Sequence, residues 1–221
     1  MSRWARCAAA LPVFCLAACT GSLFHSKVAP PTVYLLSAGA PAPTAPAAPA
    51  APAGASSATL IPADLTVLKP RLRSGLESDR IAVLYPDRHL DYFAQARWSG
   101  PLGEVLQDLA VQEFRSHANL RAVSGDASVF GSAYWLEIEV TDFQAEYTST
   151  AAPTVHVHFL ARLGGSGDRR ILGQFAANAQ QLAAENRLTA IVGAYELAAD
   201  AALAEIAAGV RETLAKVSEA R

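Results

Sequence analysis

Trp135-Leu136-Glu137-Ile138-Glu139-Val140 alternates between apolar and acidic side chains after its tryptophan. In an extended chain successive side chains point to opposite faces. The three aliphatic residues therefore share one face, and the two glutamates share the other. This alternation predicts a strand with one face on a hydrophobic core and the other face towards water.

The same pattern returns downstream and predicts an antiparallel hairpin. Residues 155–163 carry an apolar side chain at every second position, and residues 171–176 form the returning strand. Gly164-Gly165-Ser166-Gly167-Asp168, between them, is typical of a turn. These glycines do not match a phosphate-binding loop, which needs Gly-x-x-x-x-Gly-Lys followed by Ser or Thr at the start of a helix.

Further strands are expected before this hairpin, because short apolar runs there are bounded by Pro, Gly, Asp and Ser. The expected ranges are 33–37, 65–72 with a break at Pro70, 80–85, 90–98 as a strand or an irregular edge, and 120–123.

Two helices complete the predicted elements, at about 101–117 and 189–216. Pro101 is typical of a first helical turn, and Thr189 is a candidate N-cap. Each helix has one apolar stripe, made of Leu102, Val105, Leu106, Leu109 and Phe114 in the first and Ile191, Tyr195, Ala199, Ala202, Ile206, Val210 and Val217 in the second. The alanines predict close packing of the second helix. The fold class is therefore α+β, a mainly antiparallel sheet with both helices packed on one face.

The N-terminus resembles a bacterial lipoprotein signal. Arg3 and Arg6 precede a short apolar run that ends in Leu16-Ala17-Ala18-Cys19, the pattern of a lipobox. The run is shorter than the roughly 20 residues that a spanning helix needs. An ordinary secretory signal, cut after small residues, is the alternative interpretation.

We expect cleavage between Ala18 and Cys19, removal of residues 1–18, and acylation of Cys19. The other two cysteines lie in the removed segment. The mature domain would then depend on a packed core and not on disulfides. The residue after the cysteine is threonine and not aspartate, which favours transfer to the outer membrane in Gram-negative cells.

Composition divides the remaining chain. Residues 19–32 are expected to be a tether, 33–37 the first strand, and 59–217 an α+β domain. Residues 38–58 are almost entirely Ala, Pro, Gly, Ser and Thr, and proline at this density blocks both helix and sheet. They are expected to be disordered, either as an insertion within the fold or as a spacer before it. The formal net charge is −2, without a basic block, which argues against nucleic acid as a partner.

The sequence contains few candidates for catalysis or metal binding. His156 and His158 share a strand face and could ligate a metal, but no third ligand is evident. The alternative is a solvated polar face. Asp87, His89 and Asp91 are close in sequence, which is weak evidence for acid–base chemistry. No catalytic residue, metal or cofactor is therefore predicted.

An aromatic group at residues 92–98 has two interpretations. Tyr92, Phe93 and Trp98 lie near Arg97, and such residues either pack into a core or gather at partner-facing surfaces. Tyr92, Arg97 and Trp98 are retained as candidate partner-facing residues.

Several segments together resemble the ABC-type transport auxiliary lipoproteins, including those of the PqiC type. The segments are the lipobox ending in Cys19, Tyr34-Leu35-Leu36-Ser37, Asp79-Arg80-Ile81-Ala82-Val83, Leu90-Asp91-Tyr92-Phe93-Ala94-Gln95-Ala96-Arg97-Trp98 before Pro101-Leu102, Tyr134-Trp135-Leu136-Glu137-Ile138-Glu139-Val140-Thr141-Asp142-Phe143, and the Ala-rich C-terminal helix. The Ala/Pro-rich residues 38–58 depart from the family pattern as a long insertion.

The resemblance implies a non-enzymatic subunit of an ABC transporter with an MCE-domain periplasmic protein as partner. Such systems move phospholipid or other hydrophobic molecules between the inner and outer membranes. The lipoprotein would be held by acyl chains on Cys19 at the periplasmic face of the outer membrane and would dock the MCE component.

Three other functions stay open. One is a structural lipoprotein of an envelope assembly or secretion machine unrelated to lipid transport. Another is an anchored hydrolase, which a polar pocket joining His89 or His156 to acidic residues would favour. The third is a domain that itself holds lipid, because its strands are apolar and its last helix is rich in alanine.

Overall fold

The computed structural model describes residues 30–39, 60–125, 131–148, 151–168 and 170–220. Residues 31–221 form one compact unit. The signal segment, the lipobox and Cys19 lie outside the described residues. Residues 40–59, which include most of the Ala/Pro-rich segment, also lie outside them, and the residues on both sides of that segment belong to the same compact unit.

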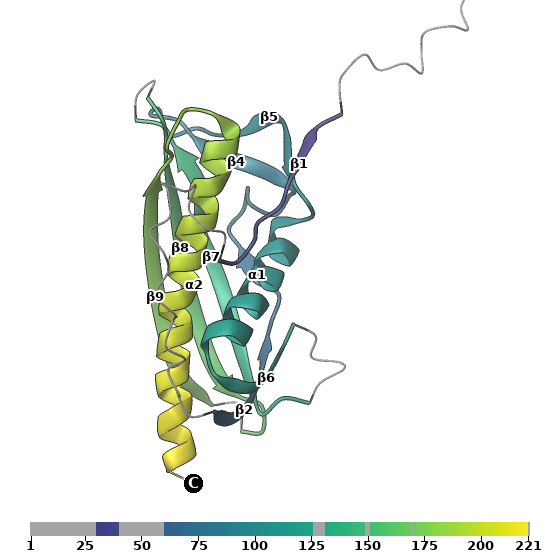
Figure 1. Cartoon of the computed structure of the whole chain (residues 1–221), viewed down its shortest axis with the longest axis vertical. Coiled ribbons are helices and arrows are strands. Elements are labelled where there is room, and N and C mark those ends of the chain that lie inside the picture. Colours follow the sequence, from purple (N-terminus) through teal and green to yellow (C-terminus); the bar gives the residue numbers. More distant parts are fainter. Residues whose placement is uncertain (1–29, 40–59, 126–130, 149–150, 169, 221) are drawn as a thin grey trace, which may run out of the picture. The chain divides into compact units, whose positions relative to one another are not determined.

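The nine-stranded sheet is organised around β7 (Tyr134–Glu146), the strand that contains the alternating stretch (Figure 1). One edge of β7 pairs along its length with β8 (Thr154–Gly165), and β8 pairs with β9 (Ile171–Leu182), both antiparallel. The predicted hairpin is confirmed. Its strands are longer than the alternation indicated, and β9 continues to Leu182.

The other edge of β7 is occupied by three short strands in succession. These are β2 (Ile61–Val67), β3 (Arg71–Leu72) and β4 (Arg80–Leu84), and all three run parallel to β7. The expected strand at 65–72 is thus two strands, because the chain passes through Pro70 between them. Proline lacks the N–H that a continuous ladder requires.

The sheet is completed by three outer strands. β5 (Leu90–Trp98) pairs antiparallel with β4, whereas β6 (Leu120–Ser124) and β1 (Thr32–Tyr34) pair parallel with β2 and β5. The expectation of a mainly antiparallel sheet therefore holds only in part, and the sheet is mixed. Local periodicity identifies hairpins, but parallel pairs join segments far apart in sequence.

Both helices cover the same face of the sheet, as expected (Figure 1). α1 (Leu102–His117) packs beside α2 (Leu188–Glu219), and α2 lies over β8 and β9. The prediction that Thr189 is the N-cap was wrong, because Arg187 occupies the N-cap position and makes no side-chain capping bond. Leu188 is already helical and packs against the core. Among the described residues, neither helix has the length and apolar character of a membrane crossing.

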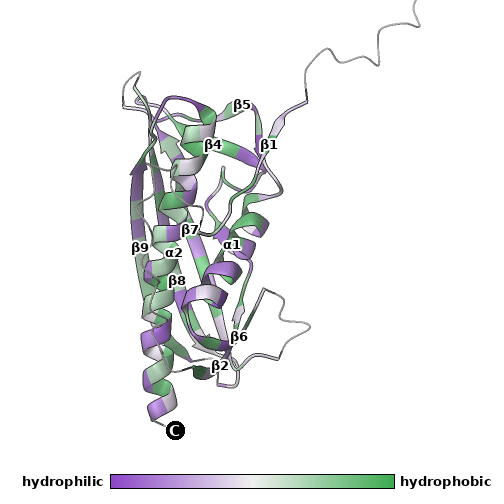
Figure 2. Cartoon of the chain, viewed as in Figure 1, coloured by the Kyte–Doolittle hydropathy of each residue, from purple (hydrophilic) through white to green (hydrophobic). Residues whose placement is uncertain are grey.

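Three aromatic rings fill the core where α2 meets the sheet. Trp98, Phe143 and Tyr195 are each at most 1% exposed, and their ring centroids lie 5.0–6.1 Å apart. The Tyr195 hydroxyl donates a 2.6 Å hydrogen bond to the Ala82 carbonyl, and burial raises the pKa of this phenol. This cluster joins α2 to β4, β5 and β7. Figure 2 shows hydrophobic residues along both helices and the central strands.

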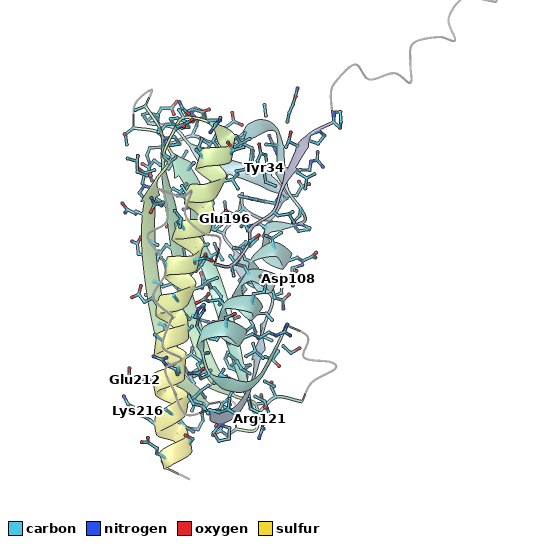
Figure 3. The ribbon with its side chains drawn as sticks, in the orientation of Figure 1. Tyr34, Asp108, Arg121, Glu196, Glu212 and Lys216 are labelled. Atoms are coloured by element: carbon cyan, nitrogen blue, oxygen red, sulfur yellow. The ribbon has the colours of Figure 1, made fainter. Side chains whose placement is uncertain are left out.

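The chain after β1 is held on α2 by two carboxylates (Figure 3). The backbone N–H of Ser37 donates to Glu196 Oε1 at 3.1 Å, and that of Gly39 donates to Asp200 Oδ2 at 2.9 Å. The first strand is Thr32–Tyr34 and not 33–37, because the chain leaves β5 after Tyr34 and crosses to α2. Partial burial raises the pKa of both carboxyl groups, and Asp200 raises that of Glu196 further.

Two glycines of α2 predict opposite effects of substitution by alanine. At Gly209 a Cβ would lie 2.6 Å from Cδ1 of Phe175 on β9, whereas a Cβ at Gly193 would meet no described atom within 4 Å apart from its chain neighbours and the backbone of its own helix. Gly209→Ala should lower the free energy of unfolding by about 1–3 kcal/mol through overpacking. Gly193→Ala should raise it by up to about 1 kcal/mol through helix propensity. Urea denaturation of residues 20–221 measures both, and equal effects would contradict this packing.

The carboxylates on α2 predict a pH dependence of stability. Because their pKa values are raised by folding, their stabilising contribution is complete below the unfolded-state pKa and is lost as pH rises through the folded-state pKa. The double substitution Glu196→Gln and Asp200→Asn should flatten the fall in stability from about pH 4 to pH 7, the range above the ordinary carboxyl pKa. Its amide oxygens can still accept both N–H groups.

Glu212→Gln is the control for this experiment. Glu212 lies on the same helix, but its hydrogen bond to Lys216 lowers its pKa, so its contribution has the opposite sign. Thermal denaturation between pH 4 and pH 7 gives the slopes. If stability falls with pH as steeply in the double variant as in the unmodified chain, folding does not raise the pKa values of these two carboxyl groups.

Candidate functional site

The candidate partner-facing residues occupy three different environments. Trp98 is 1% exposed and belongs to the aromatic core, so its assignment to a partner-facing surface was wrong. Arg97 is exposed and its Nη1 lies 3.2 Å from Asp79 Oδ2. Tyr92 is half-buried beneath the Arg80 guanidinium, whose carbon lies 3.9 Å from the ring centroid. These residues form no common surface, because Trp98 is enclosed by the core and the register of β5 against β4 shifts between Tyr92 and Arg97.

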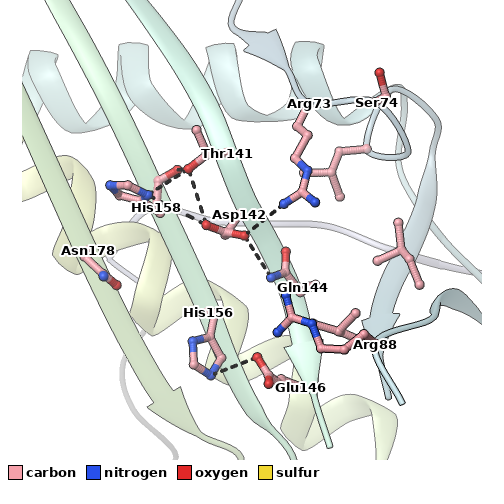
Figure 4. A pocket seen from close by; sticks show the side chains of 13 residues that line it. Arg73, Ser74, Arg88, Thr141, Asp142, Gln144, Glu146, His156, His158 and Asn178 are labelled. Atoms are coloured by element: carbon pink, nitrogen blue, oxygen red, sulfur yellow. Dashed lines mark hydrogen bonds and ion pairs between the residues drawn. The ribbon is translucent and has the colours of Figure 1, made fainter. Parts of the chain in front are cut away.

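The sheet face opposite the helices carries a polar pocket, here called the open-face pocket (Figure 4). Its cavity volume is about 240 Å³. The lining residues come from the β3–β4 loop, the two ends of the β4–β5 hairpin, and β7, β8 and β9: Arg73, Ser74, Leu76, Leu84, Arg88, Leu90, Thr141, Asp142, Gln144, Glu146, His156, His158 and Asn178.

A β-bulge in β7 builds the floor of this pocket. The buried side chains are Leu136, Ile138 and Val140 and then Phe143 and Ala145, so the alternation shifts by one residue. The register against β8 shifts at the same place, between Val140 and Asp142. Thr141 and Asp142 therefore both line the pocket, as bulges commonly arrange at functional positions. The shift was visible in the sequence as a three-residue interval between Val140 and Phe143.

Asp142 is the centre of the pocket's hydrogen bonds. Its Oδ1 accepts a 3.1 Å hydrogen bond from Gln144 Nε2 and lies 3.5 Å from Arg73 Nη1. Its Oδ2 accepts a 3.4 Å hydrogen bond from the Thr141 hydroxyl and lies 3.7 Å from His158 Nδ1. Gln144 is 8% exposed, and its Oε1 also accepts from the Phe143 N–H. Both Asp142 oxygens and both ends of the Gln144 amide are thus engaged.

The two histidines lie on the same strand face, as predicted, and each faces one acidic residue. His156 Nε2 is 3.7 Å from Glu146 Oε2, and His158 faces Asp142. No group of three His, Cys, Asp or Glu residues within the described part of the chain could hold a metal ion. His158 and Asp142 face each other with Thr141 between them, but Thr141 Oγ1 contacts the same ring nitrogen, Nδ1, at 2.8 Å. A nucleophile–histidine–acid triad requires two different ring nitrogens.

Asp87, His89 and Asp91 do not form one cluster. His89 Nδ1 lies 2.5 Å from Asp87 Oδ1, and the His89 ring stacks on Tyr85 at 4.7 Å between centroids. The hydrogen bond from His89 lowers the pKa of Asp87, which is exposed. The carboxylate of Asp91 instead accepts the Tyr92 N–H. This arrangement is that of a surface turn between β4 and β5.

The pocket wall formed by residues 73–76 depends on Gly75 and Tyr92. Gly75 has φ +95°, and the Tyr92 hydroxyl donates a 2.8 Å hydrogen bond to its carbonyl. A Cβ on Gly75 would lie 2.8 Å from Leu90 Cδ2. Tyr92, a candidate partner-facing residue, thus positions the loop that carries Arg73 and Ser74. Sequence reasoning missed this role, because Gly75 and Tyr92 meet only when β5 folds back.

The chain belongs to the family of ABC-type transport auxiliary lipoprotein components, whose model matches residues 34–207. The expected family is confirmed. A search of curated proteins finds no match.

Solved structures share the fold. Protein XCC0632 from Xanthomonas campestris is 22% identical, with a TM-score of 0.69 over 85% of this chain and 99% of its own. The hypothetical protein CT253 from Chlamydia trachomatis is 10% identical, with a TM-score of 0.51 over 70% of this chain and 99% of its own. At these identities the likeness extends to the fold and not to the site residues.

The conformation of the pocket wall predicts that substitution of Gly75 lowers the stability of the domain. Gly75→Ala should destabilise the domain by about 1–2 kcal/mol, because an L-residue at positive φ is strained and the new methyl meets Leu90. Gly167→Ala is the control, since no described atom lies within 4 Å of a Cβ there and its φ is not positive. Urea denaturation compares the two. A neutral Gly75→Ala variant would show that this loop conformation does not matter.

Proposed function

We propose that this chain is the outer-membrane-anchored lipoprotein subunit of an ABC/MCE-type transporter. Such a transporter moves phospholipid or other hydrophobic molecules between the inner and outer membranes. The observation that carries the proposal is the match of the auxiliary lipoprotein family to residues 34–207, behind a lipobox ending in Cys19. The family places the chain with an ABC transport system, and the lipobox supplies a means of attachment to a membrane.

In this proposal the subunit docks and does not catalyse. Acyl chains on Cys19 hold one end of the chain in the outer-membrane leaflet, and more than one chain gives stable anchoring. The folded domain, residues 31–221, is then available on the periplasmic side to an MCE-domain protein. At Thr141, His158 and Asp142 the hydroxyl and the carboxylate face the same ring nitrogen, so these three residues are not arranged as a catalytic triad.

The anchoring part of the proposal is tested by Cys19→Ala. Radiolabelled palmitate should label the unmodified protein and not this variant, and the variant should leave the outer-membrane fraction. Cys15→Ala is the matched control, because Cys15 lies in the segment expected to be removed and should leave labelling intact. If Cys19→Ala changes neither the location of the protein nor the outer-membrane barrier, the anchor proposal is wrong.

The partner is tested separately by in vivo crosslinking and purification in detergent. An MCE-domain protein should be recovered with the unmodified chain and in reduced amount with Cys19→Ala, since anchoring raises the effective concentration at the membrane. Recovery of a secretion or envelope assembly protein without an MCE domain would instead support the structural alternative.

A further inference from the structure

We propose that the open-face pocket binds a small zwitterion that carries a phosphate and a primary ammonium, as in phosphoethanolamine. The phosphate would contact Arg88, and the ammonium would contact Glu146. The chemistry is the same for a soluble metabolite and for a lipid headgroup. The inference stands on the pocket alone and does not require the transport role.

The first observation is that the pocket contains two opposite charges that do not pair with each other. Arg88 and Glu146 both line the cavity, and the ion pairs of the described residues include none between them. Arg73 is engaged with Asp142, and the ion-pair contact of Glu146 is His156 at 3.7 Å. The Arg88 guanidinium has no hydrogen-bond or ion-pair partner among the described residues. A ligand that bridges the two groups would satisfy both (Figure 4).

The second observation is the backbone that presents Arg88. Its φ is +70°, in the left-handed region that glycine and asparagine favour. The turn is closed by the Arg88 N–H donating to the Tyr85 carbonyl at 2.8 Å and the Tyr85 N–H donating to the His89 carbonyl at 3.1 Å. The turn directs the guanidinium to the pocket, and its planar set of donors matches phosphate oxygens.

The third observation concerns the other polar side chains of the pocket, some of which already have hydrogen-bond partners and some of which do not. Asp142 and Gln144 already make hydrogen bonds to other pocket residues and to the backbone, so they form a polar floor. Asn178 and Ser74 also line the cavity, and their side chains have no hydrogen-bond partner among the described residues. These two side chains offer further hydrogen-bonding groups along the cavity wall, and the guanidinium of Arg88 supplies several donors for phosphate oxygens. Glu146 is the remaining carboxylate. A simple anion would face it without compensation, whereas an ammonium pairs with it.

The size and the apolar wall agree with a ligand of this kind. A cavity of about 240 Å³ lies below the roughly 300–1,000 Å³ of pockets for drug-sized ligands. Leu76, Leu84 and Leu90 form one wall, and Leu90 is 39% exposed. These side chains can contact the methylene groups between the two charges, or the start of a glycerol backbone.

The test is isothermal titration calorimetry on residues 20–221, which contain every residue of the hydrophobic core. Phosphoethanolamine is the probe, with inorganic phosphate and ethanolamine as the two half-ligands. Arg88→Gln and Glu146→Gln should each weaken phosphoethanolamine binding at least tenfold, as loss of one charge-assisted contact does. Arg162→Gln is the matched control, because Arg162 lies on the same sheet face but pairs with Glu137 and Glu139 outside the pocket.

The half-ligands separate a zwitterion site from other outcomes. Glu146→Gln should bind inorganic phosphate at least as well as the unmodified chain, while Arg88→Gln should lose it. Near-UV circular dichroism of each variant checks that the fold is retained. The proposal is overturned if phosphoethanolamine does not bind at millimolar concentration, if Glu146→Gln leaves its affinity unchanged, or if Arg162→Gln weakens it as much as Arg88→Gln.

A final comparison identifies the source of the ligand. Dihexanoyl phosphatidylethanolamine below its micelle concentration presents the same headgroup on a lipid, and dihexanoyl phosphatidylcholine replaces the ammonium hydrogens with methyl groups. Tighter binding of the ethanolamine lipid than of free phosphoethanolamine supports the site and assigns it to a lipid headgroup. Weaker binding of that lipid supports the site and assigns it to a soluble metabolite. Equal affinity for the choline lipid would contradict the contact with Glu146.

Discussion

The structure depends on the hydrogen bonding of β7 along both of its edges. A central strand leaves buried N–H and C=O groups unless partners lie on each side, and an unpaired buried group costs about 1–3 kcal/mol. On one edge β8 satisfies this requirement over the full length of β7. On the other edge β2, β3 and β4 share it in succession. Three strands that precede β7 in the sequence must therefore each pair with this edge of β7.

The two faces of this sheet are used differently. The helix-covered face is packed through small residues, since a Cβ on Gly209 of α2 would lie 2.6 Å from the Phe175 ring and Ala177 beneath the helix is 1% exposed. The Tyr195 hydroxyl then reaches the Ala82 carbonyl and joins α2 to the short-strand side of the sheet. On the opposite face no helix of the described chain covers the strands. Polar side chains lie on that face, and because of the bulge the adjacent residues Thr141 and Asp142 both line the pocket.

Membership in the auxiliary lipoprotein family links this fold to an ABC transport system. The proposed acylation of Cys19 and the proposed pocket ligand are chemically independent of each other, because one would be a covalent attachment and the other would be a non-covalent contact with polar groups of the folded domain. The proposed docking role and the proposed ligand can therefore each be correct or wrong without the other.

Local sequence determined the elements that depend on short-range physics. The alternation at 135–140 and 155–163 predicted the β7–β8 hairpin, and the stripes at 101–117 and 189–216 predicted both helices, because periodicity reports which face is buried. The bulge could also have been predicted from the interval between Val140 and Phe143. The candidate site was predicted only in part: the shared strand face of His156 and His158 was evident, and Arg73, Arg88 and the role of Tyr92 were not.

What only the tertiary structure decided was how distant segments meet. The parallel pairings of β2, β3 and β4 with β7, the burial of Trp98 and the attachment of residues 37–39 to α2 all join residues far apart in the chain. Periodicity carries no information about strand order, since any strand with an apolar face could pair at several places. The pocket follows from that order, because its charged groups come from the β3–β4 loop, the β4–β5 turn, β7 and β8, which meet only once β7 is paired on both sides.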